Sequence, residues 1–348
     1  MRKLTFGFIG IGLIGGSIAK AIRRVLPEST IIVYNRRESS RTLALNDGTA
    51  NIATDKVDST FSQCDYIFLC TPVEKNVEYL SILKKIINDN CIITDVGSVK
   101  TNIHQAVNAI GLEEHFIGGH PMAGSEKTGY ENANDRLVEN AYYPLTPTNK
   151  VEQKYVDELT KIVKMIGAIP IRISYEEHDK VVAAISHLPH LIAASLVNLV
   201  KHNDSKEEYM KTLAAGGFKD ITRIASSSPE MWEQICMTNT KNISIMLDKY
   251  IHDLKDIKSS LDNKRGSDIN ALITESRDYR DNIEEHNNSI IPRSYRIYCN
   301  IIDESGAIAT IATILATSGV SIKNIGIVHN REFEDGVLKI SFYDQDSA

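Results

Sequence analysis

The glycine-rich stretch GIGLIGGS, close to the start of the chain, restricts the fold more than any other segment. Gly10, Gly12 and Gly15 have the G-x-G-x-x-G spacing and follow the apolar run LTFGFI, which is typical of a strand. The first glycine allows a tight turn, the second lets a pyrophosphate approach the backbone, and the third lets a helix pack closely on the strand. A helix-type segment and a second strand-type run follow. This order predicts a dinucleotide site that includes the intervening Leu13 and Ile14.

The pattern along the chain divides it into three parts. Residues 1–174 contain seven strand-type runs separated by helical segments: LTFGFI, TIIVYN, DYIFLCTP, CIITDVG, HFIGGHP, AYYPLTP and AIPIRIS. This alternation predicts an α/β domain of the Rossmann type, a doubly wound, mostly parallel sheet with helices on both faces. The pattern is then helical, so we expect an all-α domain over 175–290. After the polar linker EEHNNSIIPRS, residues 295–348 read as strand, helix, strand, strand.

Composition and charge exclude several classes of protein. The chain has 348 residues, of which 42% are hydrophobic, enough for more than one core. Its net charge is -6 and no segment gathers lysine and arginine, so we expect no nucleic-acid partner. The five cysteines are scattered, which favours a reducing, cytoplasmic setting. Glycines and basic residues interrupt the apolar N-terminus, and no apolar run approaches membrane-spanning length, so we expect neither a signal peptide nor a membrane segment.

The end of the second strand bears on the choice of cofactor. An enzyme that prefers NAD usually has an acidic residue there to bind the ribose 2′-hydroxyl, whereas this chain has Asn35 followed by Arg36 and Arg37. Guanidinium groups suit a 2′-phosphate, so the sequence favours NADP over NAD, unless both arginines are simply solvated. Thr71 and Pro72, at the end of a later strand-type run, are further expected cofactor contacts.

Two residues at predicted strand ends are candidates for chemistry. Ser98, in DVGSVK, would face a ligand at the carboxyl edge of the sheet, or would cap a helix that begins near Val99. His120, in GGHPMAGSEKT, follows another predicted strand, and imidazole titrates near neutral pH as a general base requires. We expect Gly118 and Gly119 to let a ligand approach the backbone, although a histidine in a glycine loop is often only structural.

The segment SHLPH lies within a long helical stretch of the second domain. His187 and His190 are three residues apart and share one helix face, and Pro189 removes a backbone hydrogen bond and kinks the helix. A metal site is the rival interpretation. No further ligand has suitable spacing and no H-E-x-x-H pattern occurs, so no metal is expected.

The segment AAGGFKDITRIASSSPEMWEQI contains an arginine among apolar residues. Arg223 lies between Ile221 and Ile224, and a bidentate grip on a carboxylate would explain its place. An ion pair with Asp220, one helical turn away, explains it equally well.

Taken together, these motifs resemble the prephenate and arogenate dehydrogenases of tyrosine biosynthesis. The matching segments occur in the family's order: GIGLIGGS, DVGSVK, GGHPMAGSEKTG, SHLPH and GGFKDITRIASSSPEMW. The resemblance implies oxidation and decarboxylation of prephenate to 4-hydroxyphenylpyruvate, with hydride transfer to NAD or NADP.

The resemblance also implies roles for individual residues. His120 would accept the proton of the ring hydroxyl, and Ser98 would orient that hydroxyl or the imidazole while contacting the cofactor. Arg223 would hold a substrate carboxylate. The remaining residues would line the cavity or the nicotinamide side, namely Ser186, His187, His190, Gly217 and Trp232.

A homodimer through the helical domains is also implied, and helix 182–200 is apolar on nearly all sides and must be covered. The tail resembles an ACT domain, a ferredoxin-like module that often senses amino acids, so L-tyrosine is an expected effector. After GVLKISFYD only QDSA remains, so the module's last helix and strand are missing or supplied otherwise. A sheet edge is then expected to be exposed.

Alternatives to prephenate oxidation remain open at this point. Arogenate differs from prephenate in carrying an amino group in place of the side-chain keto group. A β-hydroxyacid dehydrogenase would rely on a lysine in the helical domain, which SHLPH does not supply. A non-catalytic sensor of dinucleotide and amino acid would not need Ser98, His120 and Arg223 together.

Overall fold

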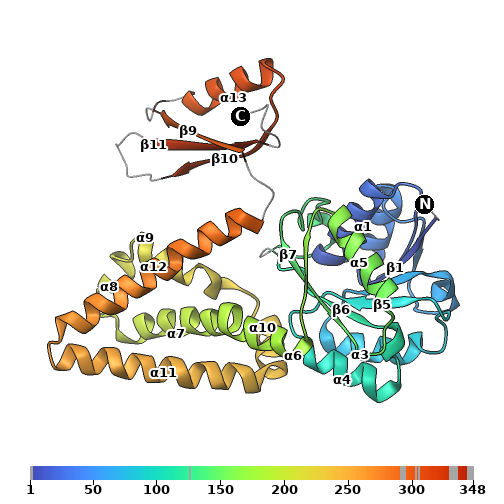
Figure 1. The fold of residues 1–348 in the computed structure, drawn as a ribbon, viewed down its shortest axis with the longest axis horizontal. Coiled ribbons are helices and arrows are strands. Elements are labelled where there is room, and N and C mark those ends of the chain that lie inside the picture. The colour runs from blue at the N-terminus through green and yellow to red at the C-terminus, as the bar shows by residue number, and fades with distance from the viewer. Residues whose placement is uncertain are drawn as a thin grey trace. The chain divides into compact units, whose positions relative to one another are not determined.

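The computed structural model describes residues 3–124, 127–290, 295–301, 304, 306–328 and 336–342 (Figure 1). The chain forms two compact units, Met1–Leu254 and Lys255–Ala348. The first unit holds every candidate residue named above.

A five-stranded parallel sheet forms the centre of the first unit, in the order β3-β2-β1-β4-β5. Its strands are β1 (Thr5–Ile9), β2 (Thr30–Tyr34), β3 (Ile52–Thr54), β4 (Tyr66–Leu69) and β5 (Ile92–Asp95). The predicted Rossmann-type parallel sheet is therefore confirmed for the first four strand-type runs, whereas the last three form a separate sheet. The sequence did not predict β3, whose three residues are too few to form a recognisable apolar run.

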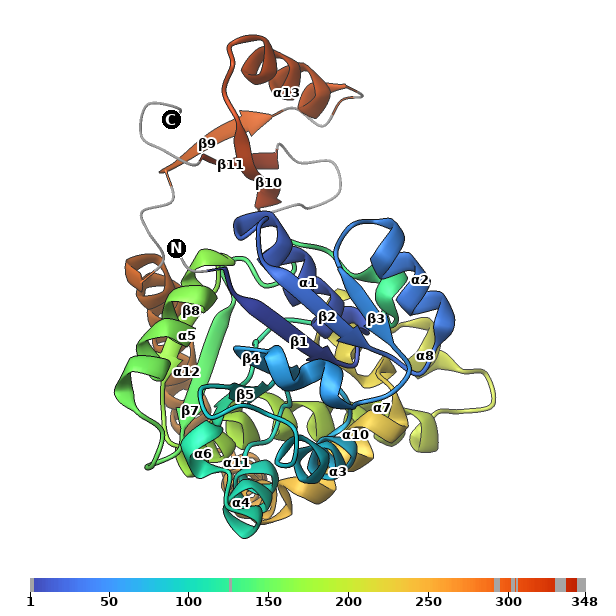
Figure 2. The ribbon, with the colours of Figure 1, turned by 90° about the vertical axis from the view of Figure 1, so that its right-hand side faces the viewer.

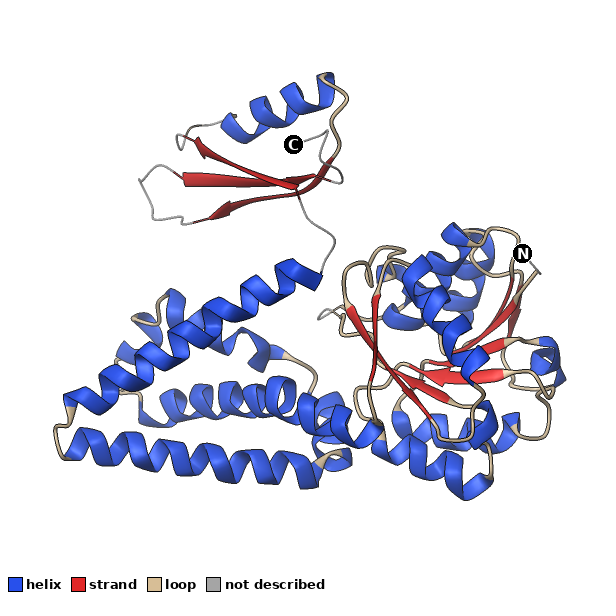
Figure 3. Cartoon of the chain, in the orientation of Figure 1, coloured by secondary structure: helices blue, strands red, loops and turns tan. Residues whose placement is uncertain are grey.

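Helices cover both faces of this sheet, as the views in Figures 2 and 3 show. They are α1 (Leu13–Val25), α2 (Glu38–Asn46), α3 (Val73–Leu83), α4 (Thr101–Ile110) and α5 (Gln153–Met165). Apolar residues of α1 and α5 share one buried cluster with alternate residues of β1 and β2, such as Phe8 and Val33. The other face packs on α3 and α4 through Ile9 and Ile67. Alternate strand residues thus enter different cores, as in sheets covered on both sides.

A second sheet of three strands continues the first unit. It consists of β6 (Ile117–Gly119), β7 (Tyr142–Pro147) and β8 (Ile169–Arg172), with β7 antiparallel to β6 and parallel to β8. A single bridge between Ile93 and Phe116 links it to β5. The side chain of His120, directly after β6, is therefore carried to the carboxyl edge of the main sheet.

Helices follow from Tyr175, with Ser174 as the N-cap that accepts a hydrogen bond from the Glu177 amide. They are α6 (Tyr175–Val182), a π-helical turn (Ala183–His187), α7 (Leu188–Asn203), α8 (Tyr209–Thr212), α9 (Gly216–Thr222), a 3₁₀ turn (Arg223–Ser226), α10 (Pro229–Thr238), α11 (Thr240–Asp262) and α12 (Gly266–Ile290). The π turn lies just before Pro189, so the predicted distortion takes this form.

The continuous helix Tyr175–Asn203 is long and apolar enough to cross a membrane, contrary to the sequence expectation. Core helices of soluble proteins meet the same criterion. This helix carries buried Asp179, His187 and His190, and these groups contact other parts of the first unit. The helix therefore packs within the folded first unit, where its polar side chains are buried against other segments.

The second unit ends in an antiparallel sheet with strand order β10-β11-β9. Its elements are β9 (Tyr295–Ile301), α13 (Ala307–Thr317), β10 (Ile322–Val328) and β11 (Gly336–Phe342). Leu338, Ile340 and Phe342 of the central strand form its buried core. The strand, helix, strand, strand pattern is confirmed, and the ACT resemblance stays a prediction. The final residues QDSA lie outside the described part of the chain.

Candidate functional site

The glycine loop at the end of β1 has the shape that a dinucleotide requires. Gly10 has a φ of 94°, a conformation that side chains rarely adopt. A Cβ on Gly15 would lie 2.3 Å from the Gly10 carbonyl oxygen and 2.8 Å from Cβ of Cys70, whereas a Cβ on Gly12 would meet nothing within 4 Å. Gly12 is the N-cap of α1, and Leu13 and Ile14 open this helix. The free space beside Gly12 therefore fits a phosphate at a helix N-terminus.

The turn after β2 contains two arginines, Arg36 and Arg37, whose guanidinium groups have no hydrogen-bond partner among the described residues. Asn35 is half-buried, and Arg36 and Arg37 are exposed. The guanidinium of Arg41 donates to the carbonyl oxygens of Asn35 (2.7 Å) and Arg36 (3.1 Å) and so holds this turn. The guanidinium groups of Arg36 and Arg37 make no hydrogen bond or ion pair to the described residues.

Thr71 and Pro72 form the corresponding turn after β4. The Thr71 hydroxyl donates to Oδ1 of Asn76 (2.6 Å), and Pro72 is the N-cap of α3. This turn lies beside the glycine loop, since a Cβ on Gly10 would lie 2.7 Å from the Thr71 methyl carbon.

Ser98 is half-buried in the loop between β5 and α4. The prediction that it caps a helix is wrong, because α4 begins at Thr101 and its N-cap is Lys100. The Ser98 hydroxyl makes no hydrogen bond within the described chain. It is thus free to bind a ligand.

His120 is held against a second histidine. The His120 amide donates to the carbonyl oxygen of Pro144 (3.0 Å), which continues the β6–β7 ladder. Its Nδ1 lies 2.9 Å from Nε2 of His178 in α6, and the two rings are 70° apart. The loop from the sheet and the first helix of the helical part therefore meet at this contact.

Asp179 completes a chain of three polar side chains. Its carboxylate lies 2.8 Å from Nδ1 of His178 and accepts the backbone amides of Lys100 and Thr101, both at 2.8 Å. Burial alone would raise its pKa, but hydrogen bonds from His178, Thr101 and Lys100 hold the pKa of Asp179 below its usual value. Asp179 is therefore an anion that can only accept hydrogen bonds.

This arrangement determines which ring nitrogens carry protons. Because the Asp179 carboxylate accepts, His178 must donate from Nδ1, and its Nε2 is left as an acceptor. His120 then donates from Nδ1 to His178, which leaves a lone pair on Nε2 of His120. Burial lowers the pKa of His120 well below its usual value, and nearby His178, Lys100 and His187 lower it further. The His120 ring is therefore neutral at neutral pH, as a general base must be.

The glycines before His120 have a different role from the one expected. A Cβ on Gly118 would lie 2.3 Å from Oγ1 of Thr146, and one on Gly119 would lie 2.8 Å from the Asp95 carbonyl oxygen. The prediction that they admit a ligand is wrong. They are glycines because β5, β6 and β7 pack too closely for side chains.

His187, His190 and Trp232 form a second cluster on the helical side. The rings of His190 and Trp232 are stacked with centroids 3.4 Å apart, and the His187 ring meets Trp232 edge-on at 6.1 Å. The shared face of the two histidines is thus confirmed. Asn239 binds Nδ1 of His187 (3.2 Å) and the carbonyl oxygen of Asp179 (2.8 Å), which links this cluster to the His120 chain. Ser186 lies half-buried in the π turn.

Gly217 lies in the first turn of α9, and Arg223 begins the 3₁₀ turn that follows this helix. Both residues are exposed. In the region the structure describes, no ion pair joins Arg223 to Asp220, so that interpretation of the sequence is wrong. The Arg223 guanidinium remains available to an anionic ligand.

Sequence reasoning missed His178, Asp179 and Asn239. The segment YEEHDK reads as the charged start of a helix, and only its position after the last strand of the second sheet could have drawn attention to its adjacent histidine and aspartate. Asn239, which separates α10 from α11, carried no signal.

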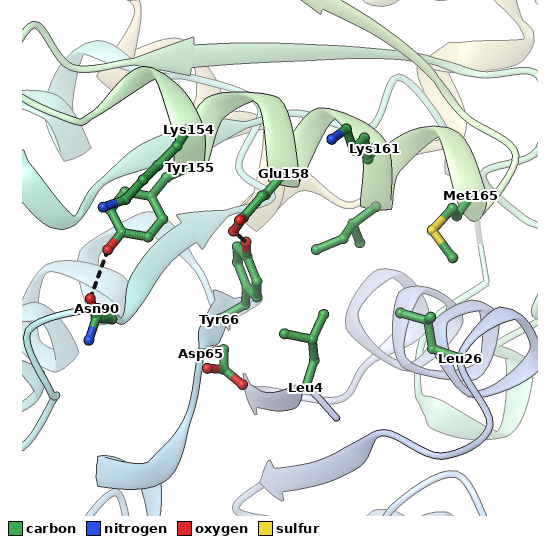
Figure 4. A pocket seen from close by; sticks show the side chains of 11 residues that line it. Leu4, Leu26, Asp65, Tyr66, Asn90, Lys154, Tyr155, Glu158, Lys161 and Met165 are labelled. Carbon is green, nitrogen blue, oxygen red and sulfur yellow. Dashed lines mark hydrogen bonds between the residues drawn. The ribbon is translucent and has the colours of Figure 1, made fainter. Parts of the chain in front are cut away.

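Other parts of the described molecule do not compete with this site. The described residues contain no group of three histidine, cysteine or acidic side chains placed to hold a metal ion. A pocket of about 480 Å³ lies under α5, at the amino ends of β1 and β4 and thus at the opposite edge of the sheet (Figure 4). Four of its polar residues form two pairs, Tyr66 with Glu158 (2.8 Å) and Tyr155 with Asn90 (3.0 Å).

Comparisons with known proteins agree with this architecture. Two family models match, "Prephenate dehydrogenase, nucleotide-binding domain" over residues 18–172 and "Prephenate dehydrogenase, dimerization domain" over residues 174–275. The prephenate dehydrogenase of Bacillus subtilis is 38% identical over 346 residues, which are 99% of this chain and 93% of the relative. That of Lactococcus lactis is 33% identical, over 98% and 94%.

A solved structure gives the same assignment. Prephenate dehydrogenase from A. aeolicus, in complex with hydroxyphenyl propionate and NAD+, superposes with a TM-score of 0.76 and 31% identity over 81% of this chain and 99% of that one. The chain therefore belongs to the prephenate dehydrogenase family of nicotinamide-dinucleotide-dependent oxidoreductases.

Proposed function

We propose that this chain catalyses the oxidative decarboxylation of prephenate to 4-hydroxyphenylpyruvate, with His120 as the general base. The contact of His120 with His178, and of His178 with Asp179, carries the proposal. It leaves a lone pair on Nε2 of a neutral imidazole at the carboxyl edge of the sheet, the edge at which β1 leads into the glycine loop. A purely structural histidine does not require this ordered chain of acceptors.

The residues act on the hydroxyl proton of the substrate. Nε2 of His120 takes this proton. The positive charge that forms on the imidazole is stabilised by the Asp179 carboxylate through His178. The bound cofactor supplies the hydride acceptor for the ring carbinol carbon. The ring carboxylate leaves as CO₂, and its bonding electrons pass through the substrate ring to the former carbinol oxygen. The phenolate that results takes the proton back from His120 to give the phenol. Ser98, with a free hydroxyl, orients the substrate hydroxyl or the His120 imidazole.

Arg223 is the proposed partner of a substrate carboxylate, because its guanidinium has no ion pair within the described chain. The stacked pair of His190 and Trp232, with Ser186, His187 and Gly217, would line the cavity. Arg36 and Arg37 are proposed to bind a 2′-phosphate and so favour NADP.

An activity matrix tests the function directly. Purified enzyme is given prephenate or arogenate with NAD+ or NADP+, and reduced nicotinamide is followed at 340 nm. The proposal predicts turnover of prephenate, with the higher kcat/KM for NADP+. Preference for arogenate would reassign the substrate, since a dehydrogenase for arogenate, from Synechocystis, is 28% identical with a TM-score of 0.74. Absence of any turnover would favour a dinucleotide sensor.

We further propose a soluble, cytoplasmic homodimer formed through the helical part. The matching model for this part is described as a dimerization domain, and Ile185, Leu199 and Met237 expose 63%, 58% and 67% of their surface. Sedimentation velocity should give twice the chain mass of 38.7 kDa, and a monomer at all concentrations would contradict the proposal.

L-Tyrosine is the proposed effector of the C-terminal sheet. The support is the order of β9, α13, β10 and β11 along the chain and the strand order β10-β11-β9 in the sheet. Titration calorimetry with tyrosine, alongside phenylalanine as a matched control, tests it. No heat of binding and no inhibition would contradict the proposal.

A further inference from the structure

Two buried side chains of opposite charge lie under the His120 loop. Asp95 ends β5, Lys100 precedes α4, and both residues are fully buried. The Lys100 ammonium forms an ion pair with the Asp95 carboxylate. The cost of removing both charges from water offsets much of the Coulombic attraction in such a pair. A contribution to folding stability therefore does not by itself explain why the pair is buried here.

The pair holds both backbone polar atoms of Gly119, the residue before His120. Nζ of Lys100 donates to the Gly119 carbonyl oxygen (2.7 Å), and the Gly119 amide donates to Oδ1 of Asp95 (3.2 Å). Among the residues that the structure describes, an isolated bridge from Ile93 to Phe116 joins β5 to the residue directly before β6. After this bridge, the Asp95 and Lys100 side chains make the hydrogen bonds to Gly119 that the backbone of a neighbouring strand would otherwise make.

The same pair reaches the other two segments of the site. Oδ2 of Asp95 accepts the amide of Gly97 (2.9 Å), the residue before Ser98. The Lys100 amide donates to Asp179 (2.8 Å). The ion pair therefore contacts the segments that carry Ser98 and His120, and the backbone amide of Lys100 contacts Asp179.

We propose that the Asp95–Lys100 pair is a positioning device for the proposed base, fixing Gly119 so that the His120 imidazole meets His178 and its Nε2 faces the substrate. The inference rests on the proposed function. The pair also acts electrostatically: after burial and His178, the Lys100 charge is the next cause that lowers the pKa of His120, followed by His187. Two carboxylates also face this region: Asp179 is separated from His120 by His178, and Asp95 accepts the amide of Gly119, the residue before His120.

Lys100→Met tests the proposal, because it keeps the length of the side chain and removes its charge and donors. We expect kcat to fall at least about 10-fold, since small misplacements of a reacting group are costly, and the dissociation constant for the cofactor to change less than about 3-fold. The acid limb of kcat/KM should move to higher pH, because a charge that opposes protonation of His120 is gone. Lys161→Met, at an exposed lysine of α5, is the matched control and should change none of these values.

A folded Lys100→Met variant with unchanged kcat and an unchanged acid limb would overturn the proposal. Breaking a buried pair is strongly destabilising, so this variant can fail to fold. The double variant Asp95→Asn with Lys100→Met removes both charges and avoids a lone buried ion. It should fold, bind the cofactor and show the same loss of kcat, and a normal kcat in it would equally overturn the proposal.

A second readout separates this inference from the proposed function. The titration of His120, assigned by its loss in His120→Asn, is followed by NMR of ¹³C-labelled histidine. Lys100→Met should raise its pKa. If the wild type does not oxidise prephenate but this shift occurs, the proposed function fails and the positioning pair stands. Absence of the shift and of any change in the His120 resonance would contradict the pair's role whatever the activity.

Discussion

Nδ1 of His120 lies 2.9 Å from Nε2 of His178, so the proposed base at the edge of the sheet is oriented by the first helix of the helical part. His178 is in turn held by Asp179, which also accepts the amides of the turn before α4. Packing of α6 on the sheet and the tautomer of His120 are therefore coupled. A helix shifted by about 1 Å would leave the imidazole without its acceptor.

Asp179→Asn should reduce kcat by about two to four orders of magnitude. The new amide can donate to Nδ1 of His178, so that His178 donates from Nε2 to Nδ1 of His120. Nε2 of His120 would then carry the proton. KM for prephenate should change little. Steady-state kinetics measure both values, and Glu177→Gln, at an exposed carboxylate on the same helix, is the control. Near-normal kcat in Asp179→Asn would refute the assignment of tautomers.

The pH dependence of kcat/KM follows from the lowered pKa of His120. The neutral ring is the active form, and it persists below the usual histidine pKa of about 6.5. The acid limb should therefore lie below pH 6.5, with a constant rate between about pH 6.5 and 7.5. Initial rates at subsaturating prephenate give the profile. An acid limb above pH 6.5 would show that burial is not the main influence on the pKa of His120.

Stability should respond to acid through two other buried histidines. Burial lowers the pKa of both His104 and His187 to about 4, while in the unfolded chain it is about 6.5. The unfolded state therefore binds more protons below pH 6.5, and the free energy of unfolding should fall by about 1.4 kcal/mol per pH unit for each histidine between those values. Urea denaturation at pH 7, 6 and 5 measures this slope, which His187→Asn should reduce.

Gly12 in the glycine loop and Gly16 in the first turn of α1 should respond differently to alanine. A Cβ on Gly12 meets nothing within 4 Å, whereas one on Gly16 would lie 2.7 Å from the Tyr130 ring and 2.9 Å from Cβ of Ala133. Gly12→Ala should weaken cofactor binding and leave the melting temperature unchanged. Gly16→Ala should lower stability by about 1–3 kcal/mol. Cofactor titrations and thermal melts on both variants check this, and the reverse pattern would contradict the role assigned to Gly12.

Much of the fold followed from local patterns. Seven strand-type runs became strands, because buried strands are short, apolar and bounded by turns. The helical stretch and the C-terminal order of strand, helix, strand, strand along the chain were also as predicted. The three-residue β3 has too little sequence to show such a pattern. The glycine loop carried its own geometric requirement, and its structure matches that requirement.

The partners in the site could not be predicted in the same way. His120 and His178 are 58 residues apart, and Lys100 and Asp179 are 79 apart. Periodicity describes neighbours on one element, not which elements meet. Gly118 and Gly119 were misjudged for this reason, since the atoms that exclude their side chains belong to β5 and β7.

Cofactor preference should depend on the turn after β2. Asn35→Asp would place a carboxylate where a ribose 2′-hydroxyl is bound, and it would repel a 2′-phosphate, so kcat/KM for NADP+ should fall at least about 10-fold relative to NAD+. Arg36→Gln with Arg37→Gln should act in the same direction by removing two uncommitted guanidinium groups. Arg172→Gln, at an exposed arginine of β8, is the control and should leave the ratio unchanged. Ratios of kcat/KM for the two cofactors decide the point. If the double arginine variant kept the wild-type ratio while Asn35→Asp changed it, the arginines would be solvated residues of the turn, and Asn35 alone would determine the preference.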